Sequence, residues 1–144
     1  MTGTGRVALR FGRFNLVGLL GAALQPVLMT LLTNYCGLGS VAATPIAVEL
    51  TLLHNFLWHE RFTWRDRKAT GFSRVAIRLA RFHAANGAVS LCGNTLLMYW
   101  LVERLKLPVA PSALVAIALC ALVNFRVADR WVYAISPAAR LERR

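Results

Sequence analysis

Four long apolar runs alternate with polar segments along this chain. The runs extend over residues 14–33, 41–58, 84–102 and 109–125. Each is close to the ~20 residues that an α-helix needs to cross the hydrocarbon core of a bilayer. In hydrocarbon a backbone amide must be paired within its own segment, so runs of this kind fold as helices. The pattern predicts an all-α membrane protein with four transmembrane helices.

The longest polar segment lies at the centre of the chain, between the second and third apolar runs. Its second part is amphipathic, because Phe72, Val75, Ala76 and Leu79 recur at helical spacing with arginines between them. We expect this part either to lie along the membrane surface or to extend the third transmembrane helix.

An internal duplication is visible around the apolar runs. Residues 55–64 and 124–133 both read Asn-Phe, three residues, an acidic residue, Arg, an aromatic residue, Thr or Val, and a second aromatic residue. Their offset is 69 residues (124 − 55). Upstream, Arg-Phe at 13–14 matches Arg-Phe at 81–82, at an offset of 68 (81 − 13). Two motifs in matching register predict two related halves of the chain.

Each half contains two of the predicted spans, so both halves enter the membrane from the same side and are parallel, not inverted, repeats. The expected fold is therefore two parallel-repeat helical hairpins, about 13–64 and about 81–133, in a single membrane domain that covers residues 1–144. Four helices are thin for an enclosed pathway, and for this reason a homo-oligomer is also expected.

Small residues are spaced four apart in the first and third runs. Gly18 with Ala22, and Ala84 with Ala88, have the spacing that lets membrane helices approach closely. These two pairs are the predicted positions of close helix packing.

Composition agrees with a membrane protein and argues against a nucleic-acid partner. Of the 144 residues 57% are hydrophobic and only 16% are charged, whereas a soluble domain has about 45–50% and about 25%. The net charge of +11 would by itself suggest nucleic acid. The basic residues, however, lie between long apolar runs and not on one face of a soluble fold.

Lys and Arg are distributed unevenly among the polar segments. The N-terminal arm holds three, the central segment seven and the C-terminal end five, whereas the two other loops hold only Arg104 and Lys106. Cytoplasmic loops are enriched in Lys and Arg. We therefore expect a multi-pass protein of the inner (cytoplasmic) membrane whose two termini and central segment face the cytoplasm.

The arginines of the duplicated motifs are expected to gather at the cytoplasmic end of the helices. A guanidinium binds phosphate oxygens through two parallel hydrogen bonds, so such a group of arginines suits a lipid phosphate. The same arginines are also compatible with a role as membrane anchors beside a belt of interfacial aromatic residues. The arginines are Arg13, Arg61, Arg81 and Arg130, and the belt would be Phe62, Trp64, Trp131 and Tyr133.

Three polar residues inside the second and fourth runs are candidates for a functional role. Asn55 and Asn124 either form hydrogen bonds between helices or contact the sugar or phosphate of a lipid head group. Glu49 lies midway along the second run, where a carboxyl group is costly. It is expected either to be neutral and hydrogen-bonded to Gln25 or Asn94, or to act in proton coupling or in recognition of a sugar hydroxyl.

With these motifs the chain resembles the GtrA-like family of small membrane proteins. The resemblance extends from Arg13-Phe14 to Tyr133, and its most specific part is the repeated ending at 55–64 and 124–133. It implies translocation, or flipping, of a polyprenyl-phosphate-linked monosaccharide across the cytoplasmic membrane for cell-surface polysaccharide synthesis, beside a partner glycosyltransferase. The alternative is a non-transporting anchor or scaffold that holds such a glycosyltransferase through the basic central segment.

A third function class rests on Glu49. A four-helix cation exporter resembling the small multidrug resistance proteins also has a membrane glutamate. Those proteins have it in the first span and lack this repeat, so the duplicated motifs favour the lipid-linked sugar.

Enzymatic chemistry is not expected. The sequence has no nucleophile elbow, no phosphate-binding glycine loop and no pair of carboxylates at the membrane edge that is suited to acid–base work, since Glu60 and Asp129 each precede an arginine and are expected to pair with local charge. His54, His59 and His83 do not have metal-ligand spacing, so neither a metal nor a cofactor is expected. The expected substrate-binding residues are Arg13, Arg61, Arg81, Arg130, Asn55, Asn124 and Glu49.

Overall fold

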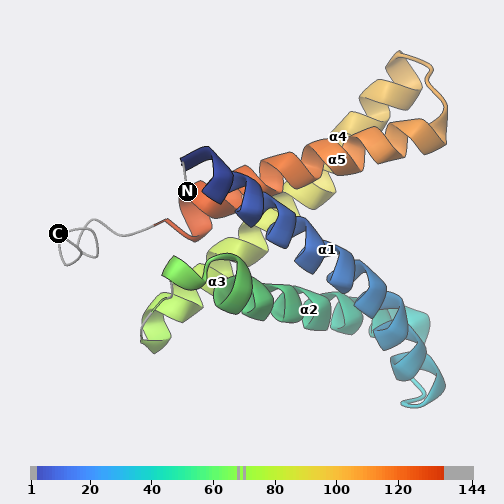
Figure 1. Ribbon diagram of the computed structural model, residues 1–144. Helices are drawn as coiled ribbons and strands as arrows, with labels where there is room; N and C mark the ends of the chain where they lie inside the picture. Colours follow the sequence, from blue (N-terminus) through green and yellow to red (C-terminus); the bar gives the residue numbers. More distant parts are fainter. Residues whose placement is uncertain (1–2, 68, 70, 135–144) are drawn as a thin grey trace. The chain divides into compact units, whose positions relative to one another are not determined.

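The structure is a computed structural model that describes residues 3–67, 69 and 71–134 (Figure 1). All regular elements in these ranges are helical. The chain divides into two compact units, Met1–Lys68 and Ala69–Arg144. Some cations of the charge count lie outside the described residues, namely Lys68, Arg140, Arg143 and Arg144.

The first unit contains two long helices joined by a short turn. Helix α1 (Gly3–Asn34) packs against α2 (Ser40–Trp58) and against the π-helical segment η1 (His59–Thr63) that continues α2 (Figure 1). The short helix η2 (Arg65–Arg67) follows. In the turn Gly37 has a φ of 67°, a left-handed conformation that glycine adopts without steric cost.

One face of α2 is buried, and the size of its buried side chains increases from the turn towards η1. Ala43 and Ala47 are buried near the turn, whereas Phe56 is buried near η1. On α1 the buried side chains include Phe14 and Val17. The large side chains therefore gather at the end of the unit where α1 begins and η1 ends, and this end holds the duplicated motif.

The second unit begins with a helical stretch that is not uniformly α-helical. Helix α3 (Phe72–Gly87), η3 (Ala88–Gly93), α4 (Asn94–Met98) and η4 (Tyr99–Arg104) follow one another directly, and η3 and η4 are π-helical. Helix α5 (Val109–Val127) returns beside η3 and α4, and the π-helical η5 (Ala128–Val132) continues it against α3 (Figure 1).

The bounds of the elements recur in the two units. Helices α2 and α5 begin 69 residues apart (109 − 40) and end 69 residues apart (127 − 58), and the same offset relates η1 to η5. The buried residues follow the same register. Those of α2 are Ala43, Ala47, Thr51 and Phe56, and those of α5 are Ser112, Ala116, Cys120 and Phe125. The duplication seen in the motifs thus extends to helix ends and to core positions.

Within the described residues, three segments are long and apolar enough to cross a membrane. They are Gly5–Asn34, Ser40–Thr63 and Val109–Val132. The third apolar run, 84–102, is not among these segments. It lies within the helical stretch from α3 to η4, in which α-helical and π-helical parts alternate. The amphipathic stretch belongs to α3 together with the start of this run, so it extends the run and is not a separate helix.

The residues that were predicted to pack closely lie on exposed helix faces of their own units. Gly18 and Ala22 are exposed on α1, and Ala84 and Ala88 are exposed in the second unit. The buried small residue of α1 is Gly21. A β-carbon at this position would lie 2.6 Å from Nδ2 of Asn55, so α1 and α2 approach closely only because residue 21 has no side chain.

Candidate functional site

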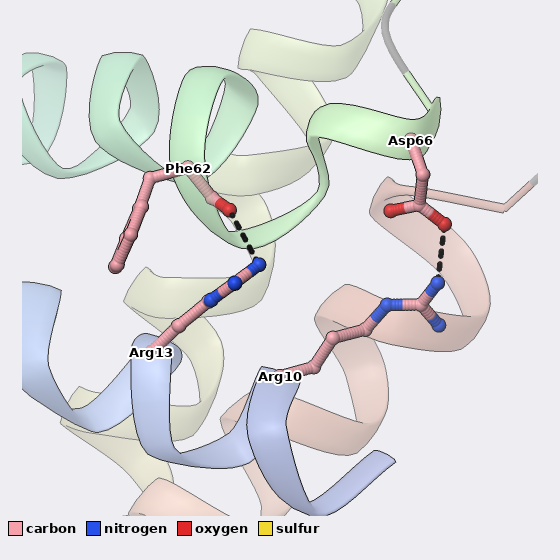
Figure 2. A network of polar contacts seen from close by, with 4 residues as sticks. All are labelled: Arg10, Arg13, Phe62 and Asp66. Carbon is pink, nitrogen blue, oxygen red and sulfur yellow. Dashed lines mark hydrogen bonds and ion pairs between the residues drawn. The ribbon is translucent and has the colours of Figure 1, made fainter. Parts of the chain in front are cut away.

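In the first unit Arg13 joins the start of α1 to the end of η1. Its side chain is half-buried, and Nη1 donates a hydrogen bond to the carbonyl oxygen of Phe62 at 3.4 Å (Figure 2). The guanidinium carbon also lies 5.0 Å from the centre of the Phe62 ring, which is a cation–π contact. About one turn earlier on α1, Arg10 forms an ion pair with Asp66 (Figure 2).

The second unit repeats this contact with the corresponding residues. The guanidinium carbon of Arg81 lies 5.7 Å from the Trp131 ring, and that of Arg78 lies 5.1 Å from the Tyr133 ring. Arg81 and Trp131 are the counterparts of Arg13 and Phe62 in the duplication. We call the two pairs, Arg13–Phe62 and Arg81–Trp131, the arginine clasps.

The clasps distinguish between the four predicted arginines. Each unit places its first arginine against the residue that follows its second arginine, since Phe62 follows Arg61 and Trp131 follows Arg130. Arg61 and Arg130 themselves are exposed, as is Arg81, whereas Arg13 is half-buried. Arg13 and Arg81 thus each contact an aromatic ring of their own unit, a contact that the structure does not show for Arg61 or Arg130 among the described residues.

The second clasp should contribute a measurable coupling energy. We expect Trp131→Leu and Arg81→Gln each to lower the free energy of unfolding by about 0.5–1 kcal/mol, because the contact is partly exposed. The double variant should lose less than the sum of the two. A double-mutant cycle in detergent micelles measures this coupling, and strict additivity would show that the contact contributes nothing.

The two predicted asparagines have different surroundings. Asn55 packs against Gly21 of α1, and its Oδ1 accepts a hydrogen bond from Nδ1 of His54 at 3.2 Å. Asn124 donates from Nδ2 to Oγ of Ser90 at 3.4 Å. Its buried Oδ1 has no hydrogen-bond partner in the part of the chain that the structure describes. Asn55 thus has a packing role between helices, whereas Asn124 retains an acceptor that could take a hydroxyl.

Glu49 is not enclosed by protein. Its side chain is exposed on α2. The reason is its register: the buried face of α2 runs through Ala47 and Thr51, and Glu49 lies between these two positions.

A buried aromatic cluster lies behind the first clasp, and the sequence did not predict it. Phe14 stacks on His59 with ring centres 4.9 Å apart, and Trp64 packs edge-on against His59 at 5.3 Å. Nδ1 of His59 and Oγ1 of Thr63 lie 3.0 Å apart. Trp64 and its counterpart Tyr133 are fully buried, so these two are core residues and not part of an interfacial belt.

Sequence signals for this cluster were present in the duplication. Phe14 directly follows the motif residue Arg13, and Trp64 closes the motif that begins at Asn55. The register alone did not separate the buried Trp64 and Tyr133 from Trp131, which recurs in the same motif and is exposed. His59 has no such signal, because its counterpart is Ala128.

Comparison with known proteins agrees with this arrangement. Residues 13–133 match the family model described as GtrA/DPMS, transmembrane domain, and these bounds are Arg13 of the first clasp and the buried Tyr133. The chain is also 33% identical over 111 residues to a dolichol-phosphate mannosyltransferase of Pyrococcus furiosus. That match covers 76% of this chain but only 30% of the length of the relative. The chain is a membrane protein of the GtrA/DPMS transmembrane-domain family.

Proposed function

We propose that this protein translocates a polyprenyl-phosphate-linked monosaccharide across the inner membrane, for use in cell-surface polysaccharide synthesis. The observation that supports this most directly is the family match, which begins and ends at the duplicated arginine-aromatic motifs. The similarity to a protein named for dolichol phosphate and mannose supports the same class of lipid. The protein would be a transporter and not an enzyme.

In this proposal the membrane arrangement is that of four spans in two parallel hairpins. The helical stretch from α3 to η4 supplies the fourth crossing, and its turn to α5 lies on the outer side. The excess of Lys and Arg in the other segments supports cytoplasmic termini. The end of each unit that contains its arginine clasp then faces the cytoplasm, where a newly made lipid-linked sugar is available.

The exposed arginines Arg61 and Arg130 would bind the lipid phosphate, and Arg13 and Arg81 would hold the helix ends that present them. A guanidinium suits this role because it keeps its charge and offers parallel hydrogen-bond donors. Asn124, with its unpaired Oδ1, would accept a hydrogen bond from a sugar hydroxyl. Glu49 would take part further along the pathway, either with a sugar hydroxyl or in proton coupling. The polyprenyl chain remains in the lipid throughout.

Uptake into sealed proteoliposomes tests the proposal. Short-chain prenyl-phosphoryl hexoses with a labelled sugar are added outside, and we expect uptake well above that of protein-free vesicles. Arg61→Gln together with Arg130→Gln should reduce uptake at least tenfold without changing the thermal midpoint by more than a few degrees. Uptake equal to that of empty vesicles for every hexose tested would contradict a transport function.

The second candidate is a membrane anchor or scaffold for a glycosyltransferase. One observation favours it specifically: in the mannosyltransferase relative, the matching residues make up less than a third of the protein. A domain of this kind therefore also occurs within a longer chain that is named as a transferase. Absence of uptake, combined with co-purification of a glycosyltransferase that depends on the central segment from Arg65 to Arg78, would select this function. A homo-oligomer is compatible with both candidates.

A further inference from the structure

A shallow cleft lies on the outward face of α2 and η1 in the first unit, and none of the roles above uses it as a whole. Its volume is about 240 Å³, and it is lined by His54, Leu57, Trp58 and Arg61. These residues are spaced i, i+3, i+4 and i+7, so they form one stripe along the helix. We call it the α2 cleft.

Its chemistry changes along the stripe. Arg61 lies within two residues of the end of the Ser40–Thr63 segment, and His54 lies about 10 Å deeper at a rise of ~1.5 Å per residue. Leu57 and Trp58, each about half exposed, lie between them. A ligand in this cleft would meet a cation at one end, an indole in the middle and an imidazole at the other end.

His54 is held in a defined orientation. Its Nδ1 donates to Oδ1 of Asn55 at 3.2 Å, and Asn55 in turn packs against Gly21. Since Nδ1 carries the hydrogen of this bond, Nε2 of the neutral ring is an acceptor. An acceptor suits a hydroxyl group and does not suit a phosphate oxygen.

Trp58 is part of a row of rings on the same helix. Its ring centre is 6.2 Å from that of His54 and 6.4 Å from that of Phe62. The Phe62 ring also contacts the guanidinium of Arg13 in the first clasp. These contacts restrict the indole and leave nearly half of its surface accessible. A rigid, exposed indole offers a flat apolar surface on which a sugar face can pack.

The second unit does not reproduce the α2 cleft. Arg61 has the counterpart Arg130, but His54 and Trp58 correspond to Val123 and Val127. The second unit therefore has the arginine but has neither the imidazole acceptor nor the indole at the corresponding positions. A function that needed only the phosphate would be served equally by both units. The extra groups of the first unit therefore point to recognition of another part of the ligand.

We propose that the α2 cleft is the site at which this protein first recognises the monosaccharide, before any contact of the sugar with Asn124 or Glu49. This inference rests on the proposed function, because it takes the ligand to be a polyprenyl-phosphate sugar. Arg61 binds the phosphodiester, whose single negative charge matches one guanidinium. The hexose packs on Trp58, and Nε2 of His54 accepts a hydrogen bond from one of its hydroxyls. Drug-sized ligands occupy pockets of about 300–1,000 Å³, so this smaller cleft suits one hexose and not an oligosaccharide.

Ligands with and without the sugar test the assignment. Farnesyl phosphate is a monoester with about −1.5 to −2 charges and the hexose forms are diesters with a single charge, so tighter binding of a hexose form cannot come from the phosphate. Binding of farnesyl-phosphoryl hexoses (mannose, glucose and galactose) is compared with binding of farnesyl phosphate, using the full chain in nanodiscs. We expect one of the hexose forms to bind at least tenfold more tightly than farnesyl phosphate. The variant His54→Val with Trp58→Val should lose this preference, while its affinity for farnesyl phosphate stays within about twofold. Val occupies both positions in the second unit, which favours folding of this variant.

Arg61→Gln should behave differently, because it removes the phosphate ligand. It should weaken binding of both ligands by about tenfold, which is the expected cost of one charge-assisted hydrogen bond. Two controls remove similar groups elsewhere: Arg104→Gln removes an exposed cation, and Trp100→Val removes an exposed indole. Neither should alter the affinity or the preference.

The outcomes separate the site from the function. Specific binding that survives unchanged in the His54/Trp58 variant would overturn the α2 cleft as the sugar site and leave the transport proposal standing. Equal binding of all hexose forms and farnesyl phosphate by the wild-type protein would also overturn it. Absence of binding to any of these lipids would contradict the proposed function itself.

Discussion

Replacement of Trp64 by alanine is expected to lower the free energy of unfolding by about 3 kcal/mol or more. Trp64 is fully buried, and its indole packs edge-on against Phe14 at 6.0 Å and against His59 at 5.3 Å. Alanine would leave a cavity in the region where α1 meets η1. The loss should be seen as a lower midpoint when the protein is unfolded by SDS in mixed micelles and followed by circular dichroism.

Trp100→Ala is the matched control for this variant. Trp100 is 61% exposed, so its removal creates no internal cavity. We expect a change of at most about 0.5 kcal/mol, as for other surface substitutions. Equal effects of the two variants would show that Trp64 does not pack in the core, and the buried aromatic cluster of the first unit would then be wrong.

Two glycine substitutions on the same helix should have opposite effects. Gly21→Ala is expected to destabilise the protein by about 1–3 kcal/mol, because the new β-carbon would lie 2.8 Å from Cγ of Asn55. Gly18→Ala meets nothing within 4 Å and should stabilise α1 by about 0.5–1 kcal/mol, since alanine is the better helix former. The same SDS titration measures both.

Asn55→Ala provides the second half of this test. It removes the side chain that collides with the β-carbon, so the Gly21→Ala/Asn55→Ala double variant should be more stable than the sum of the single effects predicts. Additive losses would mean that Gly21 is needed for another reason. Because Asn55 also holds His54, Gly21→Ala should reduce hexose preference in the α2 cleft as well as stability.

The positions of the helices follow largely from the hydrophobic pattern. The predicted runs 14–33, 41–58 and 109–125 lie inside the observed α1, α2 and α5. Length and apolar composition are sufficient here, because backbone amides in hydrocarbon have no alternative to intrahelical hydrogen bonds. The run 84–102 is helical in the structure but is not among the three segments that could cross a membrane. Its π-helical parts could not be predicted, since hydropathy does not distinguish an α-helical turn from a π-helical one.

The candidate site could be predicted only in part. The duplicated motif identified Arg13, Arg61, Arg81 and Arg130 as one set, because motif position is visible in the sequence. Which of them contact an aromatic ring, as Arg13 and Arg81 do, was not visible, since it depends on which side chain each guanidinium meets in the folded protein. Spacing likewise assigned Trp64 and Trp131 to the same belt, although one is fully buried and the other is 45% exposed.

Sequence alone therefore determined the class of the protein, the approximate ends of its helices and the register of its duplication. These properties depend on hydrophobicity and repetition along the chain, which need no knowledge of neighbours. Only the tertiary structure decided that Gly21 and not Gly18 faces Asn55, that Glu49 is exposed, and that His54, Trp58 and Arg61 line one cleft. Those facts depend on how a helix is rotated about its axis, and packing against the neighbouring helix sets that rotation.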